Sequence, residues 1–99
     1  MIQTIIKRDG REAPFEIEKI TNAIFSAAQV LGGQDHETAR DLAGKVVDYL
    51  EKDLHEERPS VETVQDAVEK ILVESGHART AKEYILYRAE RTRVREMNT

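Results

Sequence analysis

Four segments of this 99-residue chain carry apolar residues at helical spacing, and glycine or proline interrupts the chain between them. In each segment the apolar side chains recur every three or four residues, which places them on one face of a helix. The interruptions are Gly32-Gly33, Arg58-Pro59-Ser60 and Gly76. The sequence therefore predicts four amphipathic helices, joined by short loops, that bury their apolar faces against one another in one domain.

The expected helices, counted with their caps, cover residues 17–31, 35–50, 60–76 and 80–95. Asp35 and Ser60 are the expected N-caps, because a side-chain oxygen at that position accepts a hydrogen bond from a free backbone N–H of the first turn. On the fourth helix, we expect Tyr84, Ile85 and Leu86 to face the core together with Ala81.

Residues 1–15 predict a β-hairpin that precedes the helices. Thr4, Ile5 and Ile6 favour a strand, and Asp9-Gly10 is a strong signal for a two-residue turn. Pro14 restricts the second arm to an edge strand or ends it. The predicted fold class is therefore α+β, mostly α: a four-helix bundle capped by an N-terminal β-hairpin.

Composition excludes several classes of protein. The chain has no cysteine, so a disulfide framework, a zinc ribbon and a thiol nucleophile are excluded within these residues. Neither a signal peptide nor an apolar run of about 20 residues occurs, so we expect a cytoplasmic protein without a membrane segment. The glycine motifs of P-loop, dinucleotide-binding and serine-hydrolase sites are absent, and the three histidines are too widely spaced to pair as metal ligands. We therefore expect no catalytic residues and no metal site.

Charge is distributed unevenly along the chain, whose net charge is −4. Residues 35–74 hold 12 acidic and 5 basic residues, whereas the remainder holds 7 acidic and 10 basic residues. If the basic residues at the two ends of the chain meet in the fold, they form a local anion site on an acidic protein. The acidic middle argues against direct binding of duplex nucleic acid.

Two clusters of residues suggest what such an anion is. A tight hairpin places Lys7 and Arg8 at its tip, and Lys19 lies in the first turn of the following helix, so three cations and a helix N-terminus are able to hold one polyphosphate. The alternative is an ordinary solvated surface, since charged hairpin tips are common.

The second cluster lies on the fourth helix, where Tyr84, Arg88, Arg91 and Arg95 share a face. Such an arrangement suits a stacked base held beside phosphates. The alternative places Tyr84 in the core and pairs the arginines with Glu83, Glu90 and Glu96. Gln65, at the border of the third apolar stripe, is either a reader of a purine edge or a solvent-facing residue.

The chain resembles the ATP-cone domain over nearly its whole length. The segments that carry the resemblance are, in order, Lys7-Arg8-Asp9-Gly10, Pro14-Phe15, Lys19-Ile20, Val-Gln-Asp-Ala-Val-Glu at residues 64–69, and Tyr84-Ile85-Leu86-Tyr87-Arg88. The tail from Tyr87 onward is most similar to the anaerobic, glycyl-radical ribonucleoside-triphosphate reductases, just before their catalytic domain begins. Residues 1–95 are then the nucleotide-binding regulatory domain, and residues 96–99 begin a linker to a catalytic domain.

The resemblance implies an allosteric effector domain of a ribonucleotide reductase, without catalysis of its own, that serves deoxyribonucleotide synthesis. It implies ATP or dATP as effector, with Mg²⁺, and it implies the parent catalytic domain and a second cone as partners. The implied nucleotide-binding residues are Ile5, Ile6, Lys7, Arg8, Asp9, Gly10, Glu16, Lys19, Gln65, Tyr84 and Arg88. Lys7, Arg8 and Lys19 match phosphate-holding positions, whereas Ile5 and Ile6 match positions that border the adenine. Ala13 departs from the pattern, because some members have a polar nucleotide contact there.

Two alternatives differ in what the nucleotide controls. The first is the ATP-cone of a transcriptional repressor of reductase genes, for which a zinc-binding cysteine pair is expected upstream, and none lies between Met1 and the hairpin. The second is a degenerate cone that only contacts other proteins, although its phosphate-facing positions are intact.

Overall fold

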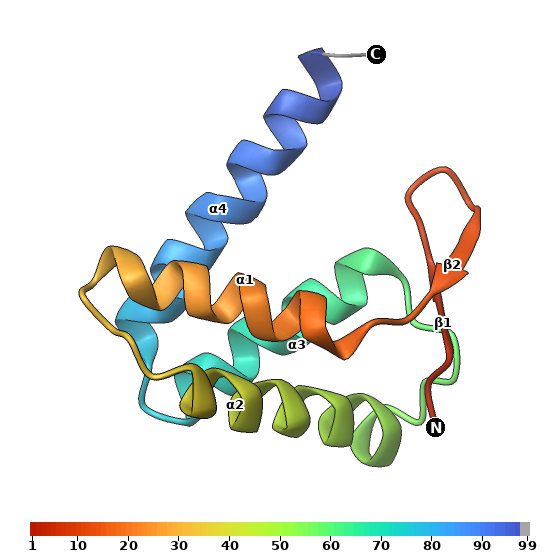
Figure 1. Cartoon of the computed structure of the whole chain (residues 1–99). Helices are drawn as coiled ribbons and strands as arrows, with labels where there is room; N and C mark the ends of the chain where they lie inside the picture. Colours follow the sequence, from red (N-terminus) through yellow and green to blue (C-terminus); the bar gives the residue numbers. More distant parts are fainter. Residues whose placement is uncertain (98–99) are drawn as a thin grey trace.

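A computed structural model describes residues 1–97, apart from the side chains of residues 95 and 96. An N-terminal hairpin of β1 (Thr4–Ile6) and β2 (Glu12–Pro14) is followed by helices α1 (Ile17–Val30), α2 (His36–Asp48), α3 (Val61–Glu74) and α4 (Ala78–Met97). The hairpin lies at one end of the helices, beside the start of α1 and of α3 (Figure 1). This arrangement confirms the predicted fold class. No helix in residues 1–97 combines the length and the apolar character needed to cross a bilayer.

The hairpin turns one residue earlier than the sequence predicted. Its strands pair antiparallel with Ile5 opposite Ala13. The turn is closed by the Gly10 N–H, which donates to the Lys7 carbonyl at 2.9 Å, so Arg8 and Asp9 are its central residues. Gly10 follows them with φ +88°, a conformation that costs glycine no steric strain. The prediction of a two-residue Asp9-Gly10 turn was therefore wrong, and the loop is the longer kind in which glycine follows the turn.

The predicted helix signals are confirmed at three positions. Asp35 and Ser60 accept hydrogen bonds from the backbone N–H groups of Thr38 and Thr63, each at 3.1 Å. Hydrogen bonds from the Thr38 side chain and backbone lower the pKa of Asp35 below its ordinary value. Gly76 follows the end of α3 with φ +84°, as expected of a glycine after the last helical turn.

The second helix continues into a wider turn that the sequence did not predict. Residues Tyr49–Asp53 form a π-helix directly after α2. This turn keeps Leu50 fully buried, and the Glu51 carboxylate accepts a hydrogen bond from the Ile2 N–H at 2.8 Å. His55 then ends the segment with φ +52°, a left-handed conformation that is unfavourable for a residue with a Cβ. The N-terminus is thereby attached to the end of α2.

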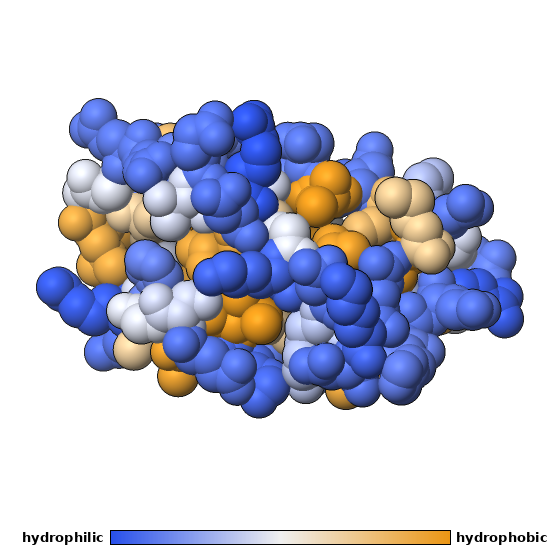
Figure 2. Space-filling model, turned by 90° about the horizontal axis from the view of Figure 1, so that it is seen from below, coloured by the Kyte–Doolittle hydropathy of each residue, from blue (hydrophilic) through white to orange (hydrophobic). Residues whose placement is uncertain are grey.

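The core lies between the four helices, and each helix packs on its neighbours in the order α1–α2–α3–α4–α1. Its most completely buried aliphatic side chains are Ile24, Val46, Leu50, Val68 and Leu72. The face of α2 that points away from the other helices is mostly hydrophilic, with small separate apolar patches (Figure 2). The periodic positions therefore predicted the buried face of each of the first three helices.

Helix α4 differs from the prediction because only its first half packs on the bundle. Ala81 and Tyr84 are buried as expected, but Ile85 and Leu86 are 46% and 55% exposed. The C-terminal half extends away from the other helices (Figure 1). The prediction that Ile85 and Leu86 face the core was wrong. The helix continues through Met97, and the rest of the predicted linker, residues 98–99, lies outside the described residues.

Candidate functional site

A cleft of about 420 Å³ lies where the hairpin tip, α1, α3 and α4 meet. The hairpin contributes Lys7 and Arg8; α1 contributes Lys19, Ile20, Asn22, Ala23 and Ser26; α3 contributes Val61 and Gln65; and α4 contributes Tyr84, Tyr87, Arg88, Arg91 and Thr92. Five of these residues are lysine or arginine, and none is aspartate or glutamate. A cleft lined by one sign of charge concentrates ions of the opposite sign, so this cleft is built to attract an anion.

The hairpin turn directs its two cations toward the cleft. The Lys7 N–H donates to the Arg11 carbonyl at 2.8 Å, which continues the hairpin pairing to the base of the turn. Asp9 accepts hydrogen bonds from the Arg11 backbone at 3.1 Å and from its guanidinium at 2.6 Å. The backbone hydrogen bond is the main reason that the pKa of Asp9 is lowered. Asp9 and Gly10 therefore shape the turn, whereas Lys7 and Arg8 line the cleft.

Arg8 also connects the hairpin to two helices. Its Nε donates to the Glu62 carboxylate on α3 at 2.7 Å, and its Nη2 donates to the Thr92 hydroxyl on α4 at 3.3 Å. The Arg8 and Glu62 side chains are 41% and 42% exposed, so solvent screens this ion pair. The side chain thus bridges three elements that are distant in sequence.

Helix α1 contributes one face with a polar row. Lys19, Asn22 and Ser26 are spaced three and four residues apart, which aligns them along the cleft. Glu16, the residue before the helix, makes no side-chain cap and instead pairs with Lys19, with 3.0 Å between its carboxylate and Nζ. Glu16 thus lies beside the cleft as a partner of Lys19 and does not line it.

Helix α4 provides two tyrosines and two arginines. Tyr84 is 5% exposed, and desolvation raises its pKa to about 12. Tyr87 is 37% exposed, and its hydroxyl accepts a hydrogen bond from Arg91 at 3.1 Å, with the guanidinium 5.8 Å from the ring centre. Among the described residues, neither Arg91 nor Lys7 forms an ion pair with a carboxylate. These two cations are therefore available to an anionic ligand.

Arg88 forms ion pairs with two carboxylates of helix α3. Its Nη1 donates to Asp66 at 3.1 Å and also to Glu69. Burial lowers the pKa of Arg88, but the hydrogen bonds to Glu69 and Asp66 outweigh burial and raise the pKa overall. Its partners are on α3, and not the glutamates of its own helix that the alternative interpretation paired with the arginines. Arg88 therefore links α4 to α3 at the wall of the cleft.

Gln65 carries a hydrogen-bonding group without a partner. Its side chain lines the cleft from α3, and its Oε1 is buried with no hydrogen-bond donor among the described residues. A buried acceptor that lacks a donor is uncommon in native proteins, because it loses its hydrogen bonds to water without replacement. Gln65 is thus suited to reorient toward a donor on a ligand.

The structure brings six of the eleven predicted site residues to one cleft: Lys7, Arg8, Lys19, Gln65, Tyr84 and Arg88. The five that do not line it are Ile5, Ile6, Asp9, Gly10 and Glu16. Ile5 packs against the core, and the Ile6 N–H donates to the Pro59 carbonyl at 2.9 Å, which adds a bridge to the chain before α3. The adenine-bordering role of Ile5 and Ile6 stays a prediction.

Other cleft residues were not predicted as site residues. They are Ile20, Asn22, Ala23, Ser26, Val61, Tyr87, Arg91 and Thr92. The spacing of Asn22 and Ser26 from Lys19 was a usable signal for the α1 face. Arg91 was noted as sharing a face with Arg88 but was not assigned to the site. Thr92 carried no such signal, because its contact with Arg8 depends on the direction of α4 relative to the hairpin tip.

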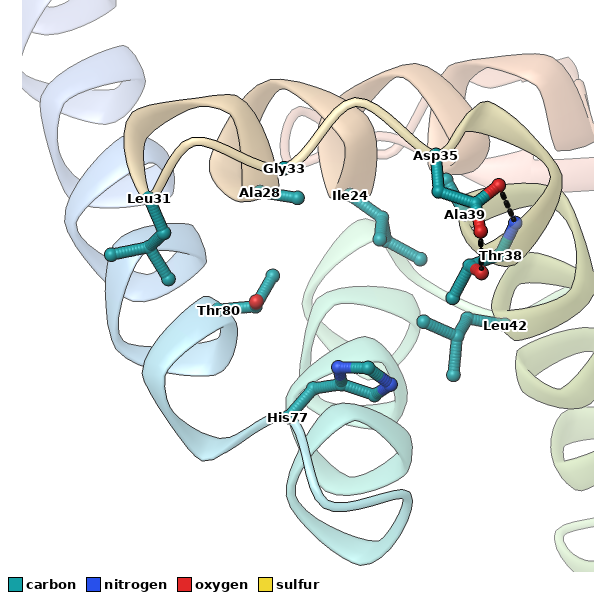
Figure 3. A pocket seen from close by; sticks show the side chains of 10 residues that line it. All are labelled: Ile24, Ala28, Leu31, Gly33, Asp35, Thr38, Ala39, Leu42, His77 and Thr80. Atoms are coloured by element: carbon teal, nitrogen blue, oxygen red, sulfur yellow. Dashed lines mark hydrogen bonds between the residues drawn. The ribbon is translucent and has the colours of Figure 1, made fainter.

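A second cavity, of about 270 Å³, lies at the other end of the bundle, between the loop after α1 and the start of α4 (Figure 3). It is lined mainly by aliphatic side chains, with Asp35, Thr38, His77 and Thr80 as its polar groups. No lysine or arginine lines it, so it does not share the character of the first cleft. Among the side chains that the structure describes, no cluster of three or more histidine, aspartate or glutamate residues is suited to a metal.

The chain belongs to the ATP-cone domain family, whose model matches residues 3–93. This match covers the hairpin, helices α1 to α3, α4 as far as residue 93, and every residue that lines the cationic cleft. The cleft is therefore part of an ATP-cone, a nucleotide-binding regulatory domain.

Its relatives include reductases of several kinds. It is 48% identical to a vitamin B12-dependent ribonucleoside-diphosphate reductase of Thermoplasma acidophilum, over 97% of this chain and 13% of that protein. It is 35% identical to a ribonucleoside-diphosphate reductase subunit alpha of Chlamydia muridarum, over 94% of this chain and 10% of that protein. It is 32% identical to an anaerobic ribonucleoside-triphosphate reductase of Haemophilus influenzae, over 93% of this chain and 13% of that protein. The chain thus spans about a tenth of the length of these relatives.

Proposed function

We propose that the cationic cleft binds ATP and dATP and that the chain is the effector-binding domain of a ribonucleotide reductase. The observation that carries the proposal is the convergence of five cations and no carboxylate on one cleft of a chain whose net charge is −4. Phosphate oxygens suit arginine and lysine donors, and arginine binds them with two parallel hydrogen bonds. Membership of the ATP-cone family supports an adenine nucleotide as the anion.

The cleft has distinct places for the phosphates and for the base. Lys7, Arg8 and Lys19 gather on the hairpin side and suit the triphosphate. Tyr87 on α4, which is 37% exposed, offers aromatic surface on which a purine stacks, whereas Tyr84 is 5% exposed and belongs to the core, as the alternative interpretation placed it. The cleft supplies no carboxylate to a metal, so a Mg²⁺ ion that accompanies the nucleotide takes its oxygen ligands from phosphate and water.

Gln65 supports adenine as the base. The unpartnered Oε1 is an acceptor that matches the exocyclic amine of adenine, whereas guanine presents a carbonyl oxygen at the same position. A Gln65→Leu change removes this acceptor at nearly constant volume. It should lower the ratio of ATP affinity to GTP affinity. It should lower the affinity for tripolyphosphate, which has no base, by a smaller factor.

Regulation follows from competition between two similar ligands for one cleft. ATP and dATP differ by one hydroxyl, so a site discriminates modestly between them by affinity alone. An effector changes activity when it favours one arrangement of the protein over another. We infer that dATP favours an inhibited association of cones and of the parent catalytic domain, and that ATP favours the active one. The relatives named above are reductases, which favours this function over that of a transcriptional repressor.

Calorimetric titration of the chain tests the proposal. We expect ATP and dATP to bind and GTP to bind more weakly. Lys7→Ala should weaken ATP binding tenfold or more, because a hydrogen bond to a charged group contributes about 1.5–3 kcal/mol. Lys45→Ala is the matched control, since Lys45 is an exposed lysine of α2 that does not line the cleft. Equal ATP affinity in the two variants would contradict the placement of the phosphates, and no binding to the unmodified chain would leave a cone that serves protein contacts alone.

A further inference from the structure

A carboxylate beside the cleft competes with phosphate for one of the cleft's cations. Although no carboxylate lines the cleft, Glu62 reaches Arg8 from the first turn of α3, with 2.7 Å between Oε1 and Nε. Arg8 is a cation that the proposed function assigns to the triphosphate. One side chain therefore has two anionic partners, one inside the protein and one on the ligand.

The two anionic partners compete for the same edge of the guanidinium. Arginine binds phosphate with two parallel N–H groups along one edge of its plane. The Nε–Nη2 edge of Arg8 is occupied by Glu62 at Nε and by Thr92 at Nη2, whereas Nη1 and the second N–H of Nη2 form the other edge. Two-point binding of a phosphate along the occupied edge therefore requires Arg8 to leave both Glu62 and Thr92. A phosphate placed beside an undisplaced Glu62 also meets like-charge repulsion, which disfavours the shared arrangement.

We propose that nucleotide binding transfers Arg8 from Glu62 and Thr92 to the phosphates, so that Glu62 acts as an internal anion that sets the affinity of the empty cone. This inference rests on the proposed function and concerns the regulation of the same site. The transfer breaks the side-chain connection between the hairpin and both α3 and α4. The protruding half of α4, where Thr92 lies, then loses this hydrogen bond to the hairpin.

Neighbouring ion pairs show why Glu62 is distinctive. Glu16 also pairs with a cleft cation, Lys19, but it lies three residues away on the same segment and connects no separate elements. Glu69 and Asp66 share Arg88, whose guanidinium stays bonded to one carboxylate when it leaves the other. Among the ion pairs of the cleft cations in the described residues, only Arg8–Glu62 joins two separate elements through a single carboxylate. The two residues are 54 positions apart in the sequence.

The test compares Glu62→Gln with Glu12→Gln by calorimetric titration with MgATP. Glu12 is a matched control, because it forms an exposed hairpin ion pair with Arg58 at 2.6 Å, lies outside the cleft, and its change alters the net charge equally. Exposed pairs of this kind contribute modestly, so Glu62→Gln should bind ATP about two- to fivefold more tightly than Glu12→Gln. The reason is that binding no longer has to break the Arg8–Glu62 pair.

Thermal unfolding of the same variants gives a second, independent measurement. Without nucleotide, Glu62→Gln should unfold at a slightly lower temperature than the unmodified chain, and saturating ATP should remove or reverse the difference, because a ligand stabilises in proportion to its affinity. Equal ATP affinity of Glu62→Gln and Glu12→Gln, with a difference in melting temperature that ATP leaves unchanged, would overturn the transfer of Arg8 and leave ATP binding intact. An unmodified chain that binds no ATP would overturn the proposed function, and this inference with it.

Discussion

Removal of the Arg88 guanidinium should destabilise the domain even without nucleotide. Arg88 is 21% exposed, and it donates to Glu69, which is 25% exposed, and to Asp66 on α3. It therefore joins the packed half of α4 to α3 close to the cleft. We consider Arg88→Met, because methionine keeps the aliphatic part of the side chain and removes only the charged donors.

The expected loss follows from the burial of the pair. A hydrogen bond to a charged group contributes about 1.5–3 kcal/mol, and the loss includes the cost of leaving Glu69 half-buried without a cation. Deeply buried pairs cost more when broken, but water still reaches Glu69 and limits the loss. In a domain of this size each kcal/mol corresponds to about 4–8 °C, so the melting temperature should fall by roughly 6–24 °C.

Thermal and urea unfolding, followed by circular dichroism, measure this change. Arg93→Met is the matched control on the same helix, because Arg93 pairs with Glu90 in an exposed i,i+3 arrangement and should be lost with little effect. Combination of Arg88→Met with Glu69→Gln should cost less than the two single changes added together, since both remove the same interaction. If Arg88→Met and Arg93→Met unfold alike, partial burial does not strengthen this pair and the reasoning is refuted.

Three further changes test other elements of the fold. Ser60→Ala should cost about 1 kcal/mol in urea unfolding, because it removes the side-chain acceptor of the Thr63 N–H at the start of α3. His55→Gly should stabilise by about 0.5 kcal/mol, since relief of the left-handed strain exceeds the entropy that glycine loses, and an unchanged midpoint would argue against strain at this position. The buried neutral phenol of Tyr84 contributes stability that is complete below its ordinary pKa of 10.0 and is lost as pH rises through the folded-state pKa of about 12. Tyr84→Phe should therefore reduce the loss of stability in alkaline urea titrations. An identical loss in both proteins would contradict the burial of this hydroxyl.

The helices and their caps were predictable because their causes are local. A helix repeats every 3.6 residues, so the apolar spacing alone indicated which side of α1, α2 and α3 is buried. Asp35 and Ser60 each satisfy a backbone N–H only three residues away, an interaction that no distant part of the chain has to complete. The hairpin was likewise predictable, apart from the position of its turn.

The errors lie where local pattern and packing disagree. Ile85 and Leu86 have the apolar character of core residues, but only one narrow face of α4 meets the bundle, and Ala81 and Tyr84 fill it. The π-helix at Tyr49–Asp53 also has no periodic signal, because it is a local adjustment that keeps Leu50 inside and brings Glu51 to the Ile2 N–H. Both features depend on where neighbouring elements lie.

The residue pattern alone identified the elements, the basic residues near both ends of the chain, and the motifs of an ATP-cone. Which charges meet depends on the packing of the helices: Arg8 contacts Glu62 and Thr92, which lie 54 and 84 residues further along the chain, and Arg88 pairs with carboxylates of α3. The difference arises from the range over which each interaction acts. Hydrogen bonds and apolar spacing within a helix act over a few residues, whereas a cleft forms only after packed cores have set how helices cross, and sequence spacing carries no measure of that crossing.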